Sequence, residues 1–500
     1  MDLQEKSIRL IHDFQQKFDV SRLEIEGIGI WPVILFELHK HNEAHPKKLR
    51  KNLFKMAIRE LKAQVKMQTD SFRDRKSHAA NGKEAEILFL TQSTRRVKID
   101  TSWYDRICDP FVDAFESIGF KCQTLEWSYD HQYKVPRHKP SDLIQLEVNL
   151  SLFRAFFSGR LIKSGFPALE SEDFQEILEK HDFTFGQFME NIDLSLRLIF
   201  SLKKYFDKKL RNIPAKIAFY FPYYSVVSFA FNLACKDKGI PAVEIQHGYF
   251  ADRTYMQNGH RNIKNRYRLF PDAIWVWGER EKEMFLRWGK KSLPHIFIGG
   301  NLWMNLWLYP ELNNRKLGDG FDSQLDSLKK NQKKIILFTL SAFLEIPEWL
   351  PSALSSAGDD ILFCIRFHHN SSQEYREKTQ KSLENLNNVE YETSNSFPLP
   401  ALLEACDLHV TIDSSSVIEA IDFSIQSIII SENGVFLFPD LIDERKWAFP
   451  ALTAPDFLTT LNTLWANSLS NKKTTEKSMA KSNAEIVKEF YNLIKSKTTN

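Results

Sequence analysis

The sequence predicts an α/β protein with two doubly wound, Rossmann-like domains and an N-terminal helical extension. Three observations carry this prediction. The chain has 500 residues, more than one ordinary hydrophobic core accommodates. Short apolar runs alternate with helix-length segments in two separate stretches, which is typical of parallel sheets. The composition is that of a globular protein, with 43% hydrophobic and 26% charged residues. We expect a cleft between the two domains, with ligands bound at the carboxyl ends of the strands.

Changes in the hydrophobic pattern set the predicted domain boundaries. The segment Leu49–Gln68 has apolar residues at helical spacing with charges between them, which indicates a helix within the extension. A polar stretch rich in Asn, Asp and Gly indicates a linker. The predicted parts are the extension (1–84), a first α/β domain with a helical insertion (85–310), the linker (311–332), a second α/β domain (333–470) and a C-terminal helix (471–500).

Individual elements follow from short apolar runs bounded by polar turns. We expect strands at 86–91, 120–127, 216–221, 241–250, 271–279 and 295–300, and then at 333–340, 361–369, 389–393, 408–413 and 426–431. The segment Tyr104–Gly119 has the pattern of a helix that ends at a glycine. Ile217–Cys235 carries no charge but contains Pro222 and several polar residues, so it predicts a strand, a turn and a helix and not a membrane span.

Charge and cysteine usage exclude several classes of function. The net charge of +3 is too small for a dedicated nucleic-acid-binding protein. The basic run Lys47–Lys51 and the pair Arg95-Arg96 are interpreted as solvated faces, or else as contacts with anionic lipid or phosphate. Five cysteines without metal-ligand spacing indicate free thiols in a reducing compartment. The segment Met1–Phe14 lacks the apolar core of a secretory signal, so we expect a cytoplasmic protein that contacts the inner face of the membrane peripherally.

Polar residues that follow the strands of the second domain are candidates for binding a phosphorylated ligand. Ser341 follows one strand, and Arg366 and His368 end another. In the run Thr411–Ala420 a strand is followed by Ser414, Ser415 and Ser416 and then by a helix that contains Glu419. A helix N-terminus with added hydroxyl donors binds phosphate, and Glu419 lies one turn further on, within reach of ribose hydroxyls. The simpler interpretation is ordinary helix capping by one of these side chains.

In the first domain the candidates follow two strands. They are Ser93 and Arg95 after one strand, and Gln246, His247 and Gly248 after the other. A histidine with an ordinary pKa near neutrality is a suitable general base for an acceptor hydroxyl. Gly248 permits a tight turn next to it. The simpler interpretation of His247 is a packed or capping histidine.

Several common motifs do not occur in this sequence. It has no Asp-x-Asp pair, no P-loop, no G-x-G-x-x-G after a strand and no G-x-S-x-G elbow. His368 and His369 are adjacent and would point to opposite faces if the strand continued through them, so they form no metal set. We therefore expect no metal and no cofactor.

The order of these segments resembles a known family. The segments are PAVEIQHGYF, a Pro-Asp-Ala strand followed by Trp-Gly, Ile-Gly-Gly-Asn, a strand that ends in histidine, and Ser-Ser-Ser-x-x-Glu-Ala. Together, over roughly residues 85–470, they are similar to bacterial capsule and surface-polysaccharide glycosyltransferases of the GT-B fold. That group includes relatives of CDP-glycerol glycerophosphotransferases, Kdo transferases and bacterial sialyltransferases.

The resemblance implies an activity and assigns roles to residues. It implies that the first domain binds a glycan or lipid-linked glycan acceptor, with His247 as base. Ser93, Arg95, Gln246 and Gly248 are candidates for the acceptor side because they follow strands of this domain. It implies that the second domain binds a nucleotide-activated sugar, with His368 in catalysis and the three serines at the donor phosphate. Ser341, Arg366 and Glu419 are candidates for the same donor site because of their positions after the strands. Relatives have His-Pro where this chain has His368-His369, a difference that argues against the branches that use CMP or CDP donors and leaves UDP- or GDP-sugars open.

Other functions are compatible with the same fold. A nucleotide-sugar 2-epimerase or a polyol-phosphate transferase would use the same architecture. A non-catalytic polysaccharide-assembly protein with this fold is the alternative from another class.

Overall fold

The computed structural model places the chain in two compact units. Unit 1 comprises Met1–Arg96, Ser102–Leu302 and Asn483–Asn500, and unit 2 comprises Val97–Thr101 and Trp303–Ser482. The structure describes residues 3–40, 62, 84–128, 133–162, 169, 172–181, 183–249, 267–287, 294–314, 321, 326, 328, 334–342, 344–369, 371–444, 446–471 and 481–498. The predicted helix at Leu49–Gln68 (apart from Lys62), the basic run Lys47–Lys51 and most of the predicted linker lie outside the described residues.

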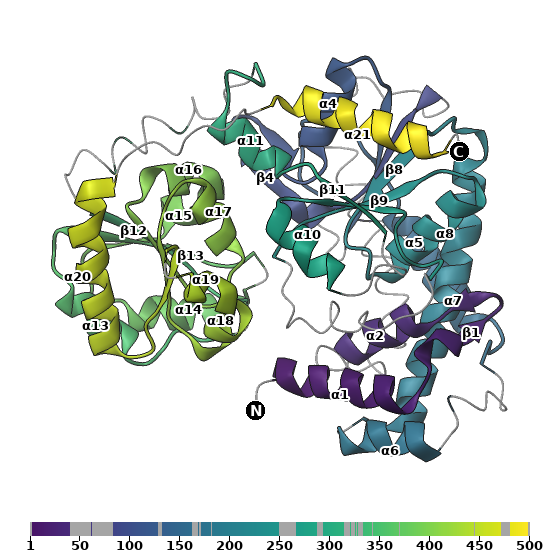
Figure 1. Ribbon diagram of the computed structural model, residues 1–500, viewed down its shortest axis with the longest axis horizontal. Helices are drawn as coiled ribbons and strands as arrows, with labels where there is room; N and C mark the ends of the chain where they lie inside the picture. The colour runs from purple at the N-terminus through teal and green to yellow at the C-terminus, as the bar shows by residue number, and fades with distance from the viewer. Residues whose placement is uncertain are drawn as a thin grey trace. The chain divides into compact units, whose positions relative to one another are not determined.

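Unit 1 contains a seven-stranded parallel sheet (Figure 1). Its strands are β3 (Ile87–Gln92), β6 (Cys122–Trp127), β7 (Asp142–Leu143), β8 (Ile217–Tyr220), β9 (Ala242–Ile245), β10 (Ala273–Val276) and β11 (His295–Ile298). Their order in the sheet is β11-β10-β9-β8-β3-β6-β7. The chain runs outward from β3 through β6 and β7, then returns to β8 on the other side of β3. The topological switch point therefore lies between β3 and β8.

Helices cover both faces of this sheet because alternate strand residues enter opposite cores. On β3, Leu88 and Leu90 face a core shared with α1 (Leu3–Lys17), α2 (Trp31–Lys40), α5 (Gln145–Phe157), α6 (Glu172–Lys180), α7 (Phe185–Lys209) and α8 (Val226–Asp237). Ile87 and Phe89 face a second core with α4 (Asp109–Ser117) and α21 (Asn483–Thr498). The C-terminal helix α21 thus packs on unit 1 beside α4, although it follows unit 2 in the sequence (Figure 1).

Unit 2 contains a six-stranded parallel sheet, drawn in green in Figure 1. Its strands are β12 (Lys334–Thr339), β13 (Ile361–Arg366), β14 (Val389–Glu390), β15 (Leu408–Thr411), β16 (Ser427–Ile429) and β17 (Ala448–Pro450). The order β14-β13-β12-β15-β16-β17 reverses between β12 and β15, which is the second switch point. The helices α13 (Leu350–Ser356) and α20 (Ala454–Asn471) cover one face over a core that includes Ile336, Phe338 and Val410.

The predicted fold class is confirmed, with differences in single elements. The segment 217–235 forms the predicted strand, turn and helix, as β8 and α8. The helix predicted from Tyr104 was wrong at its start, because Ser102–Asp105 is strand β5, paired with β4 (Arg96–Ile99), and α4 begins only at Asp109. The second sheet has a sixth strand, β17, that the pattern did not predict. In the described part of the chain no helix is long and apolar enough to span a membrane.

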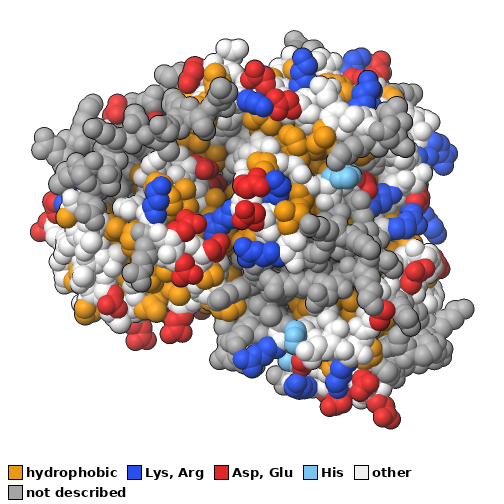
Figure 2. Space-filling view, in the orientation of Figure 1, with side chains coloured by type: hydrophobic (Ala, Val, Ile, Leu, Met, Phe, Trp, Pro, Cys, Tyr) orange, Lys and Arg blue, Asp and Glu red, His pale blue; other side chains and the backbone are white. Residues whose placement is uncertain are grey.

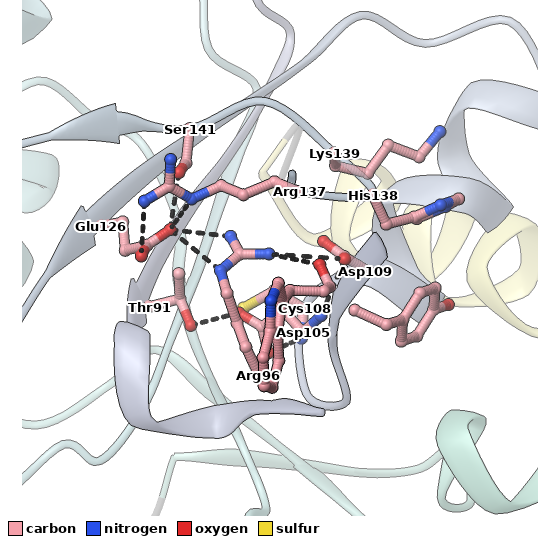
Figure 3. A network of polar contacts seen from close by, with 12 residues as sticks. Thr91, Arg96, Asp105, Cys108, Asp109, Glu126, Arg137, His138, Lys139 and Ser141 are labelled. Carbon is pink, nitrogen blue, oxygen red and sulfur yellow. Dashed lines mark hydrogen bonds and ion pairs between the residues drawn. The ribbon is translucent and has the colours of Figure 1, made fainter. Parts of the chain in front are cut away.

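The interpretation of Arg95-Arg96 as a solvated face was wrong for Arg96. This side chain is 2% exposed, and its Nη2 lies 2.7 Å from Glu126 Oε2 (Figure 3). Arg137 Nε contacts the same carboxylate oxygen at 3.1 Å. Burial acts to raise the pKa of Glu126, but Arg96 and Arg137 lower it to about 2, so the carboxylate stays charged. The Arg96–Glu126 pair joins the β4–β5 hairpin to β6.

The five cysteines are free and buried. On the face shown in Figure 2, blue and red side chains are interspersed among the described residues, as a small net charge leads one to expect.

Candidate functional site

In unit 1, cationic and aromatic side chains meet at the switch point. Arg95 follows β3, Phe221 follows β8, and the Arg95 guanidinium carbon lies 5.7 Å from the centroid of the Phe221 ring. The Phe221 ring is in turn 5.7 Å from the His247 ring, which follows β9. Three adjacent parallel strands therefore deliver these side chains to one edge of the sheet, as the carboxyl-end rule predicts.

His247 is held by a tyrosine at this edge. Tyr224 Oη lies 3.2 Å from His247 Nε2, and among the described residues no side chain forms a hydrogen bond with the buried His247 Nδ1. Burial, and then the positive charges of Arg95 and Arg106, lower the pKa of His247 to about 3. The ordinary pKa assumed from the sequence was therefore wrong. The imidazole is neutral at physiological pH, and neutral imidazole is the form that accepts a proton.

A buried carboxyl group, that of Glu244, lies on β9, the strand that precedes His247. Glu244 on β9 is fully buried, and its Oε1 accepts a hydrogen bond from Tyr223 N at 3.2 Å. Burial raises the pKa of Glu244 to about 8. Glu244 is therefore mainly protonated near neutral pH, and it adds little negative charge to the surroundings of His247.

The other residues predicted for this edge shape the loops. The Ser93 hydroxyl is buried and donates to Ser128 Oγ at 2.7 Å. The Gln246 side chain bridges two backbone groups: its Nε2 donates to Gly248 O at 3.0 Å, and its Oε1 accepts from Trp277 N at 2.7 Å. Gln246 thereby fixes the turn that contains His247 and Gly248.

At the switch point of unit 2 a carboxylate collects hydrogen bonds from two neighbouring strand ends. Asp413, after β15, accepts from the Ser341 hydroxyl at 3.2 Å and from Asn433 Nδ2 at 3.0 Å. Ser341 follows β12, and Asn433 lies in α18 (Glu432–Leu437) after β16. A Cβ on the adjacent Gly434 would lie 2.2 Å from Ile412 O, so only glycine lets α18 approach this closely.

The three predicted serines have different surroundings. Ser416 is buried, and its hydroxyl lies 2.7 Å from Thr339 Oγ1 and 3.2 Å from His409 Nε2, so it points under the turn. Ser414 and Ser415 are half-buried at the turn itself. Helix α17 (Ser416–Asp422) begins here, and Glu419 within it is only 6% exposed.

Arg366 and His368 lie at the end of β13. Arg366 Nη1 donates to Ser394 O at 2.6 Å and to Phe397 O at 2.7 Å, which ties β13 to α15 (Glu392–Ser396) and to the residue that follows it. The strand ends at Arg366, so His368 and His369 do not alternate across it. Their ring centroids are 4.1 Å apart; His368 is half-buried and His369 is exposed.

Four residues at these edges were not predicted from the sequence. Phe221 and Tyr224 follow a strand whose place next to β3 is unknown without the strand order. His409 stands inside the apolar strand β15 and has the appearance of a core position. Asn433 precedes a glycine in a short helix and gave no signal. Among the described residues, no group of three or more His, Cys, Asp or Glu side chains is arranged to hold a metal ion.

Solved structures with the same architecture exist. The UDP-GlcNAc 2-epimerase of Methanocaldococcus jannaschii superposes with a TM-score of 0.50 at 12% identity, covering 81% of this chain and 99% of that one. A candidate UDP-N-acetylglucosamine 2-epimerase of Listeria monocytogenes superposes with a TM-score of 0.51 at 13% identity, covering 83% of this chain and 96% of that one. No protein-family model and no curated sequence matches the chain. At this identity the similarity establishes the fold, which is that of two Rossmann-like domains of the GT-B type.

Proposed function

We propose that the protein is a glycosyltransferase that moves a sugar from a nucleotide-activated donor to a surface-polysaccharide or lipid-linked glycan acceptor. The observation that carries the proposal is the switch point of unit 2. There Ser341, Asp413 and the serine turn converge from β12 and β15, at the position where doubly wound sheets bind nucleotides. The two UDP-GlcNAc 2-epimerases of the same fold support a nucleotide-sugar ligand.

Two kinds of group in unit 2 suit two different parts of the donor. Hydroxyls and backbone N–H groups of Ser414 and Ser415 suit the phosphates, and His368 adds a further donor. The Asp413 carboxylate accepts hydrogen bonds and repels anions, so it suits the hydroxyls of the ribose or of the transferred sugar.

In unit 1 we assign His247 as the base. Its neutral imidazole takes the proton of the acceptor hydroxyl as that oxygen forms a bond to the anomeric carbon. The bond from this carbon to the donor phosphate breaks, and the nucleotide leaves with the electron pair. A base so strongly depressed in pKa is weak in the free protein, and a nearby anionic group on a bound substrate would raise its pKa.

A thermal-shift screen tests the donor assignment. We expect UDP or GDP, or one of their sugar conjugates, to raise the unfolding temperature, with and without Mg²⁺ and after EDTA treatment. CDP, CMP and dTDP serve as matched controls. If none of the nucleotides changes the unfolding temperature, the nucleotide site is disproved and the result favours the non-catalytic polysaccharide-assembly protein.

The second candidate is a nucleotide-sugar 2-epimerase, favoured by the names of the two solved structures. An epimerase converts donor alone, whereas a transferase needs an acceptor. NMR of UDP-GlcNAc incubated with the protein distinguishes them: a new 2-epimer without acceptor supports the epimerase. A polyol-phosphate transferase would instead respond to CDP-glycerol.

We also propose that unit 1 contacts an anionic lipid surface through α5. Leu150, Phe153 and Phe157 lie on one face of this helix and are 38%, 52% and 74% exposed. The two phenylalanine rings are 4.5 Å apart, and the exposed Arg154 lies beside them. Aromatic rings with an adjacent cation suit the interface of an anionic bilayer.

A further inference from the structure

Unit 2 contains a buried cluster of hydroxyls around an imidazole, directly beneath the turn at the switch point. Its members, which we call the His409 cluster, are Thr339 on β12, His409 on β15, Ser427 on β16 and Ser416 at the start of α17. Each is 5% exposed or less. Such a cluster is costly unless its members are hydrogen-bonded, and a satisfied one fixes a single arrangement.

The distances show that the cluster is satisfied. His409 Nε2 lies 2.8 Å from Thr339 Oγ1 and 3.2 Å from Ser416 Oγ. His409 Nδ1 lies 2.8 Å from Ser427 Oγ, on the opposite side of the ring. Thr339 Oγ1 and Ser416 Oγ are 2.7 Å apart. One imidazole therefore links three adjacent strands to the first residue of α17.

The conformation of the turn depends on the side chain that this imidazole holds. Ser416 is the residue at which the turn enters α17, and its N–H donates to Ser414 Oγ at 3.3 Å. Ser414 N in turn donates to Thr411 Oγ1 at 3.0 Å. With the Ser416 hydroxyl held inward, Asp413, Ser414 and Ser415 are left to form the surface of the turn.

We propose that His409 is a positioning residue for nucleotide binding, which acts by holding Ser416 inward and so fixes the turn Asp413–Ser415. The role rests on the proposed function of this switch point. His409 does not touch the ligand. Its loss leaves the Ser416 hydroxyl with Thr339 as its one remaining partner in the cluster, which holds the turn less firmly, so that binding must select one of several conformations.

The test is calorimetric titration of UDP and of GDP into the full chain and its variants. We expect His409→Leu and Ser416→Ala each to weaken binding about tenfold, roughly the contribution of one hydrogen bond. The double variant should bind no more weakly than Ser416→Ala alone, because that substitution already removes the hydroxyl that His409 holds. His409→Gln keeps a donor and an acceptor and should recover part of the affinity.

Ser427→Ala is the matched control. It removes the partner of Nδ1 on the side away from the turn, so it should lower the thermal midpoint while affinity stays within about twofold. A purely structural role of His409 predicts the opposite pattern: lower thermal midpoints for all variants and wild-type affinity. That result, or additive losses in the double variant, would overturn the proposal.

Two further outcomes are separable. If His409→Leu does not fold, His409→Gln and Ser416→Ala carry the same comparison. If the wild-type chain binds neither UDP nor GDP, both the nucleotide site and this role are disproved. Wild-type binding combined with unchanged affinity in the variants disproves the role of His409 alone.

Discussion

The Tyr224 hydroxyl lies 3.2 Å from His247 Nε2, and this contact orients the imidazole at the edge of the first sheet. Burial raises the pKa of Tyr224, so the phenol stays protonated over the working pH range. The hydroxyl either donates to Nε2 or accepts from it, and each arrangement fixes one tautomer of His247. Replacing His247 removes the imidazole, whereas replacing Tyr224 removes only the contact that orients it, so the two effects can be measured separately.

His247→Ala should reduce turnover by about 10²- to 10⁴-fold, the usual contribution of a general base. Nucleotide affinity should not change, since His247 belongs to unit 1 and the nucleotide is assigned to unit 2. Initial rates with a fluorescent acceptor and a separate nucleotide titration measure the two quantities. Tyr224→Phe is the control that keeps the ring, and we expect a smaller loss of turnover. Turnover near wild type in His247→Ala would remove the histidine from the base role.

Turnover should not fall near pH 6.5, where protonation of an ordinary histidine base would lower the rate. Burial and the nearby arginines lower the pKa of His247 to about 3, so the ring stays neutral as the pH falls through 6.5. Arg95→Gln removes one of the two cations and should shift the acid limb of kcat/KM to higher pH. Profiles of kcat/KM from pH 4.5 to 8 test whether the wild type lacks a limb in this range, and an NMR titration of the ring extended to about pH 3 compares the pKa of His247 in wild type and variant. A wild-type limb near pH 6.5, or no shift in the variant, contradicts the assignment.

The Arg96–Glu126 pair should dominate the stability of the β4–β5 hairpin. Removing one member of a buried pair leaves a charge without compensation and costs about 3–5 kcal/mol. Glu126 keeps Arg137 and the Ser141 hydroxyl as partners, so we expect Arg96→Met to lie at the lower end of this range. Hydrogen exchange of the β3 and β6 amides measures the change within unit 1. Arg137→Met is the control. An equal effect from both variants would show that the Arg96–Glu126 pair contributes no more to stability than the Arg137–Glu126 pair.

Glu244→Gln should stabilise the protein, and more so at high pH. The pKa of this buried carboxyl is about 8 in the folded chain and near 4.5 when unfolded. The unfolded state therefore loses its proton first, and stability declines as the pH rises from 4.5 to 8. Glutamine keeps the acceptor for Tyr223 N and cannot ionise. We expect its advantage to grow by about 3 kcal/mol between pH 5.5 and 8. Thermal midpoints at both pH values measure it, and a constant difference would contradict the raised pKa.

Strand positions were predictable because parallel strands buried on both faces appear as continuous apolar runs. The run at Ile87–Gln92 and the run at Lys334–Thr339 are examples. The β4–β5 hairpin was not predictable, because Arg96 and Glu126 are 30 positions apart and nothing local indicates that they pair. Two adjacent arginines resemble a solvated patch until that partner is known.

Some residues of the candidate sites were likewise predictable from the sequence, and others were not. Rules for strand ends identified His247, Ser341 and the serine turn, since these residues follow apolar runs directly. Tyr224 and His409 were not predicted, because contacts between neighbouring strands can be predicted only when the strand order is known. Burial also changed chemistry that the residue type suggested: His247 has a pKa far from its ordinary value, and the hydroxyl of Ser416 is directed inward.

The exposed face of α5 should bind anionic vesicles. Burying two phenylalanine rings in a bilayer interface is worth several times the thermal energy, so replacing both with serine should reduce binding about tenfold or more. Sedimentation with phosphatidylglycerol–phosphatidylcholine vesicles compares wild type with the double variant Phe153→Ser/Phe157→Ser. Leu312→Ser is the matched control, because Leu312 is 41% exposed and belongs to unit 2. Arg154→Gln should weaken binding to the anionic vesicles and leave binding to pure phosphatidylcholine unchanged, since the arginine acts through charge. Equal sedimentation of wild type and the double variant would show that α5 is not the membrane contact.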